Sequence, residues 1–263
     1  MGGRLSLLGQ RNNMKIYQTL KFTHEGVTKE IIFGSPETKE EFEKMYSLRF
    51  DVYSQKDYFK AGFEEKTDQD ALDREGKCLY AIALVDDGRV LGAVRLIRDT
   101  VLPTEKIFKF ETPGVIQSIP SEQRGEIGRL VVQRYSGESF FPRNLVLLFL
   151  LKTLSEIGYE AGVVGGYSFV KKTLLEKLNK IKVPIHLIDN YTQDYPVDGV
   201  LFNYFHQKEN PVSPVYFLRN EIEQYFESTV GSKSNIVYQE GDEKVFVLND
   251  SLYTKFLKQM KVL

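Results

Sequence analysis

The sequence is poor in the residues that build disulfide frameworks and zinc sites. It has one cysteine, Cys78, no tryptophan, and three histidines at widely separated positions. A single cysteine cannot form an intrachain disulfide, which favours a reducing compartment, and we expect a cytoplasmic protein. Because the histidines and the cysteine show none of the spacings typical of zinc ligands, we expect no metal centre.

Net charge and long apolar runs are also missing. The 35 basic and 36 acidic residues nearly cancel, so the composition indicates neither a nucleic-acid partner nor general attraction to anionic membranes. The longest apolar run, residues 145–151, is much shorter than the roughly 20 residues that span a bilayer, so any membrane contact would be peripheral. The absence of a P-loop and of a GxSxG motif argues against a kinase, a GTPase or an α/β-hydrolase.

The sequence does contain the pattern of one α/β domain. Its 263 residues, 42% of them hydrophobic, are enough for a conventional core. Periodicity and turn signals predict, in order, strands 15–22 and 28–33, helix 39–53, hairpin 78–85 with 90–97, a strand within 125–137, a buried helix after 143, strand 161–165, helix 168–180 and strand 184–188. A short helix near 220–226, a hairpin of 235–239 with 244–248 and a terminal helix follow.

This pattern predicts how the chain is divided. We expect a disordered leader over residues 1–13, a domain over 14–190, and an extension over 191–263 that packs on the same domain. Gly165 and Gly166 fall between the predicted strand and helix, where they could form a phosphate-binding turn or only a tight turn. The GxGxxG pattern is not present, so we favour the tight turn.

Several charged residues stand in apolar surroundings. Arg95 lies in VLGAVRLI, Glu126 and Arg129 lie in EIGRLVV, Arg49 ends a predicted helix, and two aspartates, Asp70 and Asp73, precede a predicted strand. Burial of a charge is costly unless the charge is paired, so these residues predict a mutual network. The network could be purely structural, which on these residues alone is at least as strong an interpretation. Alternatively, one carboxylate faces a cleft and removes a proton from a nucleophile.

With these residues, the chain resembles the acyl-homoserine-lactone synthases and their relatives, the N-acyl amino acid synthases. The resemblance rests on six charged positions in order and on the segments around them, LRFDVY, DQDALDREGKCLYAIAL, GAVRLI and EIGRLVV, and it covers roughly residues 41–188. It implies an α/β GNAT fold, in which a mixed central sheet has a β-bulge in its central strand and helices on both faces.

The resemblance also implies the reaction. Enzymes of this family transfer a medium-chain or long-chain acyl group from acyl carrier protein, or from coenzyme A, to an amine, and hold no permanently bound cofactor. The amine is S-adenosylmethionine for the lactone synthases and an amino acid for the others. The lactone synthases usually have a tryptophan after the first arginine, where this chain offers Tyr58 and Phe59. We therefore favour an N-acyl amino acid synthase over a lactone synthase.

The family assigns roles to the charged residues. An ammonium group must lose a proton before it attacks a thioester, and Glu126 is the candidate base. We expect Arg95 and Arg129 beside it at the catalytic centre, and a network that shapes the acceptor pocket from Arg49, Asp70 and Asp73. Backbone amides of the central strand would stabilise the oxyanion, here around Leu130, Val131 and Val132.

Residues after the central strand are candidates for binding the acyl donor. Phosphopantetheine would meet basic side chains and a helix N-terminus formed by Arg134, Ser136, Gly137, Arg143 and Asn144. A patch of lysines follows, formed by Lys171, Lys172, Lys177, Lys180 and Lys182. Acyl carrier proteins are acidic, so this patch could dock one, although an ordinary solvated helix face explains the lysines more simply. Two further alternatives stay open, a small-acyl transferase that uses acetyl-CoA and a non-catalytic domain that binds lipid or protein.

The spacing of Glu126 and Arg129 makes one structural prediction. In a regular strand, residues an odd number apart point to opposite faces of the sheet. A bulge near Gly128 would add one residue and bring both side chains to the same face.

Overall fold

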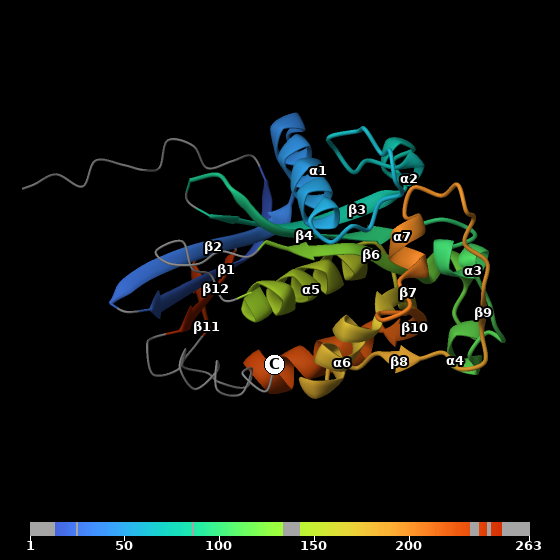
Figure 1. Ribbon diagram of the computed structural model, residues 1–263. Coiled ribbons are helices and arrows are strands. Elements are labelled where there is room, and N and C mark those ends of the chain that lie inside the picture. The colour runs from blue at the N-terminus through green and yellow to red at the C-terminus, as the bar shows by residue number, and fades with distance from the viewer. Residues whose placement is uncertain are drawn as a thin grey trace, which may run out of the picture.

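The computed structural model describes residues 14–24, 26–85, 87–133, 143–231, 237–240 and 243–248. They form a mixed ten-stranded sheet with helices on both faces (Figure 1). The strand order is β11-β12-β1-β2-β3-β4-β6-β7-β10-β8, and the pairs β1–β12 and β6–β7 are parallel. The predicted leader, residues 1–13, and the predicted terminal helix lie outside the described residues.

The strands of this sheet are β1 (Lys15–His24), β2 (Val27–Ser35), β3 (Cys78–Val85), β4 (Val90–Ile97), β6 (Arg124–Val132), β7 (Gly165–Lys171), β8 (His186–Leu187), β10 (Val212–Leu218), β11 (Val237–Glu240) and β12 (Glu243–Leu248). A separate two-stranded ribbon joins β5 (Phe108–Lys109) to β9 (Thr192–Gln193). The α-helices are α1 (Lys39–Ser54), α2 (Ala71–Arg74), α3 (Pro103–Ile107), α4 (Gly114–Gln117), α5 (Arg143–Glu160), α6 (Lys172–Lys180), α7 (Phe202–His206) and α8 (Arg219–Phe226). A 3₁₀ turn spans Ser121–Gln123 and a π-helical turn spans Glu227–Gly231.

Two hydrophobic cores lie on the two faces of the sheet. On one face, α5 packs against β3, β4 and β6, and α8 packs against α5 and β10; the apolar run of α5 is buried there as its sequence predicts. On the other face, α1 and α7 pack over β4 and β7. A capping box starts α1, because the Thr38 side chain accepts the N–H of Glu41 while the Glu41 side chain accepts the N–H of Thr38. All eight residues of β4 are buried, so any charge on β4 must find its partner inside the protein.

The predicted bulge is confirmed. Ala93 of β4 pairs with Val131 and Arg95 pairs with Gly128, so two residues of β6, Arg129 and Leu130, oppose a single residue of β4. The left-handed residue is Arg129, with φ of +54°, and not the glycine before it. Because the extra residue resets the alternation of side chains, Arg129 points to the same face as Arg95.

The sheet splits just before the bulge. The parallel pairing of β6 with β7 runs only from Arg124 with Gly165 to Ile127 with Ser168, and the two strands separate beyond that point. β7 continues to Lys171 by pairing with β10 on its other side, along its whole length. The separation opens a cleft in the middle of the sheet between β6 and β7.

The prediction of a strand over residues 161–165 followed by a helix from 168 is wrong. β7 occupies residues 165–171 and α6 starts at Lys172. Gly165 and Gly166 are therefore strand residues and not a strand-to-helix turn. A Cβ atom on Gly166 would lie 1.8 Å from the carbonyl oxygen of Gly125, so the close approach of β6 requires glycine there. Residues 212–218, which show no clear strand pattern in the sequence, form β10.

The remaining predicted elements that fall within the described residues are found. α8 and the β11–β12 hairpin match the predicted short helix and hairpin, and the hairpin joins the main sheet through β1. The division of the chain at residue 190 stays a prediction. Within the part of the chain that the structure describes, no helix combines the length and the apolar character needed to cross a membrane.

Candidate active site

A buried ion network joins α1 to the segment before β3. Arg49, in α1, is only 1% exposed, and its Nε donates to Asp68 Oδ2 at 3.0 Å. The other edge of the same guanidinium donates to Asp73, with Nη2 to Oδ2 at 2.9 Å. The Arg49 side chain therefore bridges two carboxylates and fixes the position of the irregular acidic segment on α1.

Two more arginines extend the network from the sheet. Arg95 Nη1 donates to Asp73 Oδ1 at 2.8 Å, and Nη2 donates to Asp70 Oδ2 at 2.7 Å. Arg129 Nε donates to Asp68 Oδ2 at 2.8 Å, and its Nη2 lies 3.3 Å from Asp70 Oδ2. Each of the three guanidinium groups thus contacts two aspartates, so α1, β4 and β6 are joined through three carboxylates.

The aspartates are arranged by a one-turn helix. Asp70 caps α2, because its side chain accepts the N–H of Asp73, and the Asp73 carboxylate in turn accepts the N–H of Asp70. Burial alone raises the pKa of Asp73, but the charges of Arg49 and Arg95 outweigh it and hold the pKa well below its ordinary value. Both carboxylates therefore stay ionised and serve the network as acceptors, not as bases.

Asp68 is a member of the network that the sequence did not reveal. It accepts from both Arg49 and Arg129, and its side chain is only 4% exposed. Burial raises its pKa, yet the charges of Arg129 and Arg49 lower the pKa overall. In the sequence it is one of several acidic residues in EEKTDQDALD, and nothing in that pattern separates it from its exposed neighbours.

Glu126 lies apart from this network. It is completely buried on β6, and its Oε2 accepts the N–H of Thr104 at 2.7 Å, while Oε1 has no hydrogen-bond partner among the described residues. Burial raises the pKa of Glu126 to about 7, against the opposing effects of the Thr104 hydrogen bond and the charge of Arg95. A carboxyl group with this pKa can both accept and release a proton near neutral pH.

The split between β6 and β7 holds a cleft of about 690 Å³. Its walls come from the end of α1, the segment after it, the start of α5, α6 and the residues around α7. Of the predicted site residues, five line it, and they are Arg129, Leu130, Val132, Arg143 and Asn144. Val131 and Glu126 are buried and do not line it. The predicted donor-binding residues Arg134, Ser136 and Gly137 lie outside the described residues.

The described lining of this cleft is basic. Its basic side chains are Lys56, Arg129, Arg143, Lys171 and Lys177, and the described residues that line it include no aspartate or glutamate. The first two residues of α5, Arg143 and Asn144, stand at its edge, where a helix N-terminus favours an anion. This arrangement suits a substrate with negatively charged groups.

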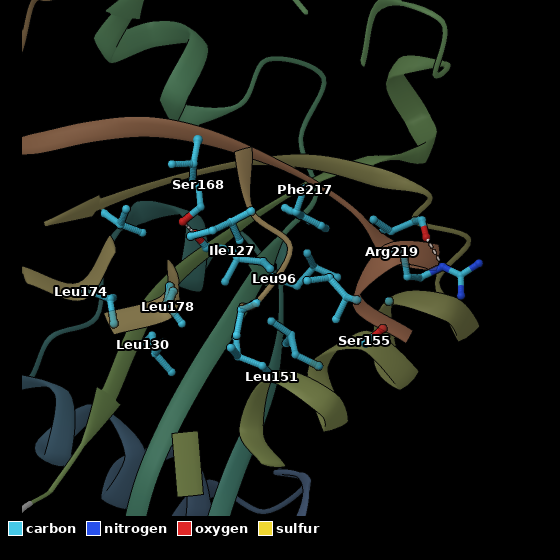
Figure 2. A pocket seen from close by; sticks show the side chains of 18 residues that line it. Leu96, Ile127, Leu130, Leu151, Ser155, Ser168, Leu174, Leu178, Phe217 and Arg219 are labelled. Carbon is cyan, nitrogen blue, oxygen red and sulfur yellow. Dashed lines mark hydrogen bonds between the residues drawn. The ribbon is translucent and has the colours of Figure 1, made fainter. Parts of the chain in front are cut away.

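A second, apolar cavity of about 70 Å³ lies on the other face of the sheet (Figure 2). Leucine, isoleucine and valine side chains from β6, β7, α5 and α6 form most of its wall. Leu130, Ser168 and Leu174 line both this cavity and the basic cleft. The two spaces are thus separated by only a thin layer of side chains.

The predicted lysine patch is corrected in one position. Lys171 is only 3% exposed and points into the cleft, because it is the last residue of β7 and not the first part of an exposed helix. Lys172, Lys177 and Lys180 are exposed on α6. Docking of a carrier protein on these three stays a prediction. Among the residues with a described placement, no group of histidine, cysteine, aspartate and glutamate could hold a metal ion.

The bulged strand, the split sheet and the helices on both faces define a GNAT-type fold. Comparison with solved structures agrees, since the chain is similar to the AHL synthase LasI, with a TM-score of 0.53 and 12% identity over 75% of this chain and 94% of LasI. It is also similar to the CoA-dependent acyl-homoserine lactone synthase MesI (TM-score 0.49, 21% identity, 72% of this chain and 88% of MesI). No protein-family model and no curated protein matches the sequence.

At these identities the likeness concerns the fold. It confirms the mixed sheet with helices on both faces that the six charged positions implied. The chemistry of this chain must be argued from its own cleft and from the residues around it.

Proposed function

We propose that this protein is an N-acyltransferase that moves a medium-chain or long-chain acyl group from a thioester to the amine of an amino acid. The donor would be acyl carrier protein or acyl-CoA, used as a substrate and not as a bound cofactor. The observation that supports this most is the basic cleft at the split between β6 and β7, which ends at a bulged strand. A cytoplasmic location is part of the proposal, because the single cysteine favours a reducing compartment.

The cleft suits a thioester on a phosphopantetheine arm. The cleft runs between β6 and β7, whose main-chain groups no longer pair with each other there. An extended arm that contains amide groups can therefore hydrogen-bond to these main-chain groups. Arg143 and the start of α5 would bind the phosphate. The bulge frees main-chain amides near Leu130 from regular pairing with β4, and these would stabilise the oxyanion of the tetrahedral intermediate.

The reaction requires one base. The acceptor ammonium gives a proton to Glu126, and the amine then attacks the thioester carbonyl to form a C–N bond. The C–S bond breaks, the thiolate leaves and takes up the second proton that the nitrogen loses, and Glu126 later releases its own proton to solvent. Because Glu126 is buried and does not line the cleft, we propose that the proton passes through water. Arg129, held by Asp68 and Asp70, would keep the bulge and the acceptor side of the cleft in place.

The acyl chain needs an apolar site of its own. The cavity in Figure 2 meets the basic cleft at Leu130 and Leu174, close to the bulge where the thioester carbonyl would lie. Entry of the chain tail between these two side chains would bury it against α5 and α6. This favours an acyl chain of several carbons over acetyl as the natural substrate.

A direct product search tests the proposal. The purified protein is incubated with medium-chain and long-chain acyl-CoA or acyl carrier protein and a mixture of amino acids, and the products are examined by mass spectrometry. N-acyl amino acids are the expected result. Absence of any amide with either donor would exclude the proposed activity, and acetyl transfer alone would favour the small-acyl alternative.

A second candidate is an acyl-homoserine-lactone synthase, which the fold shared with LasI favours. A parallel incubation with S-adenosylmethionine distinguishes the two, because this acceptor would give a homoserine lactone and release methylthioadenosine. Binding of acyl donor without any product would instead support a non-catalytic domain.

A further inference from the structure

Lys171 is a buried cation in an aromatic enclosure. Its Nζ donates to the main-chain oxygen of Tyr204 and lies 4.7 Å from the ring centroid of Tyr204 and 5.4 Å from that of Tyr58. The two rings meet edge to face with centroids 4.9 Å apart. Burial raises the pKa of both tyrosines, that of Tyr58 to about 12, so the enclosure is neutral at physiological pH.

This cation has no anionic partner among the described residues. No hydrogen bond or ion pair with a carboxylate is found for it, and the described lining of the cleft is free of aspartate and glutamate. Burial lowers the pKa of Lys171 to about 8, and no acidic group offsets the effect. One carbonyl and two ring faces only partly replace water around an ammonium, so a bound anion would complete the site.

Lys171 stands across the split from the bulge. Ile127 pairs with Ser168, and beyond that pair Leu130 of β6 and Lys171 of β7 both line the cleft. Tyr167, Phe169 and Lys171 alternate on β7 toward the face that α1 covers, which is also the face of Arg129. The ammonium therefore belongs to the same cleft as the bulge, where the thioester carbonyl would meet the amine.

We propose that Lys171 binds the carboxylate of the amino acid acceptor and so directs its amine toward the thioester at the bulge. This inference rests on the proposed function and assigns a binding residue to the acceptor's second functional group, its carboxylate. The phosphates of the donor are the other anions available. They fit better at Arg143 and the N-terminus of α5, which also line the cleft.

The test compares a free amino acid with its carboxamide, which keeps the amine and removes the negative charge. Rates are measured with one acyl-CoA for the wild type, Lys171→Met and Lys171→Arg, with Lys208→Met as control, since Lys208 is exposed and does not line the cleft. We expect Lys171→Met to raise KM for the amino acid by roughly tenfold or more, the usual effect of losing one charged contact, and to leave KM for the carboxamide nearly unchanged.

Lys171→Arg keeps the charge but cannot act as a base, so it should retain kcat and part of the affinity for the amino acid. If Lys171→Met does not fold, the same comparison of the two acceptors with Lys171→Arg tests the assignment. An equal effect of Lys171→Met on both acceptors, or a raised KM for acyl-CoA alone, would overturn the assignment. If the wild type acylates neither acceptor, the proposed function itself fails. If it acylates both and neither Lys171 variant changes the preference, only the inference about Lys171 fails.

Discussion

Glu126→Gln separates the two properties of this side chain, its burial and its basicity. Gln has nearly the same shape and can still accept the N–H of Thr104. In the wild type, burial raises the pKa of Glu126 from 4.5 to about 7. Since each pKa unit is worth about 1.4 kcal/mol, ionised Glu126 destabilises the folded protein by about 3 kcal/mol relative to the protonated form.

The sign of the pH effect follows from linkage. In the unfolded chain the carboxyl loses its proton near its ordinary pKa of 4.5, whereas in the folded protein it keeps the proton up to about 7. The folded state therefore binds more protons between these values, and its stability falls as pH rises through this range. Gln does not titrate, so the variant lacks this loss of stability.

Urea unfolding followed by far-UV circular dichroism measures the effect, because the chain has no tryptophan to report by fluorescence. At ~pH 5 the two proteins should differ only by a constant offset of up to about 1–3 kcal/mol, the cost of the amide group that replaces the unpaired Oε1. Between ~pH 5 and ~pH 8 the variant should gain about 3 kcal/mol on the wild type. Catalytic turnover should fall roughly 100-fold to 10,000-fold. Parallel stability profiles for the two proteins, or unchanged turnover, would refute this account of Glu126.

Three further substitutions test the network, the split and the apolar cavity. Asp68→Asn leaves two buried arginines short of a counter-charge and should lower the free energy of unfolding in urea by about 3–5 kcal/mol. Asp87→Asn, at an exposed ion pair, should lower it by at most about 1 kcal/mol. Equally small losses in both variants would show that the buried network contributes little to stability. Gly166→Ala should prevent native folding, because its Cβ would lie 1.8 Å from the carbonyl oxygen of Gly125. The control Gly114→Ala, whose Cβ meets nothing within 4 Å, should fold, and circular dichroism compares the two. A stable Gly166→Ala protein would contradict the close approach of β6 and β7. Leu174→Trp puts a larger side chain in the wall of the apolar cavity and should lower kcat/KM for long-chain donors roughly tenfold more than for medium-chain donors. An equal effect on both donors would mean that the acyl chain binds elsewhere.

The charged positions could be predicted from the sequence because burial of a charge requires a partner. Arg95 in an apolar strand and Glu126 near Arg129 on another already implied a mutual network, and the family resemblance implied the bulge that reconciles their odd spacing. The same reasoning could not find Asp68, since its burial depends on how an irregular segment folds over α1. It also could not show that Glu126 stands outside the hydrogen-bonded network, because only the position of Thr104 decides that.

Strand boundaries near the split could not be read from the sequence. β7 pairs with β6 at its start and with β10 along its length, so its residues are buried by segments far away in the chain. The lysines after residue 170 read as a solvated helix face. The strand in fact runs on to Lys171, and its alternation turns that side chain inward beneath Tyr58 and Tyr204. Local periodicity fails at this point because tertiary pairing and not amphipathicity fixes the end of the strand.

The proposed activity is the transfer of an acyl group from a thioester to an amine in the cleft between β6 and β7. Thiol release from acyl-CoA and amide formation, measured in the same reaction with and without an amino acid, test this claim most directly. We expect thiol release to depend on the amino acid and to equal the amide formed, mole for mole. Thiol release and amide formation should both be lost in Glu126→Gln. Thiol release that is independent of the amine, or no release with any acyl-CoA or acyl carrier protein, would contradict it.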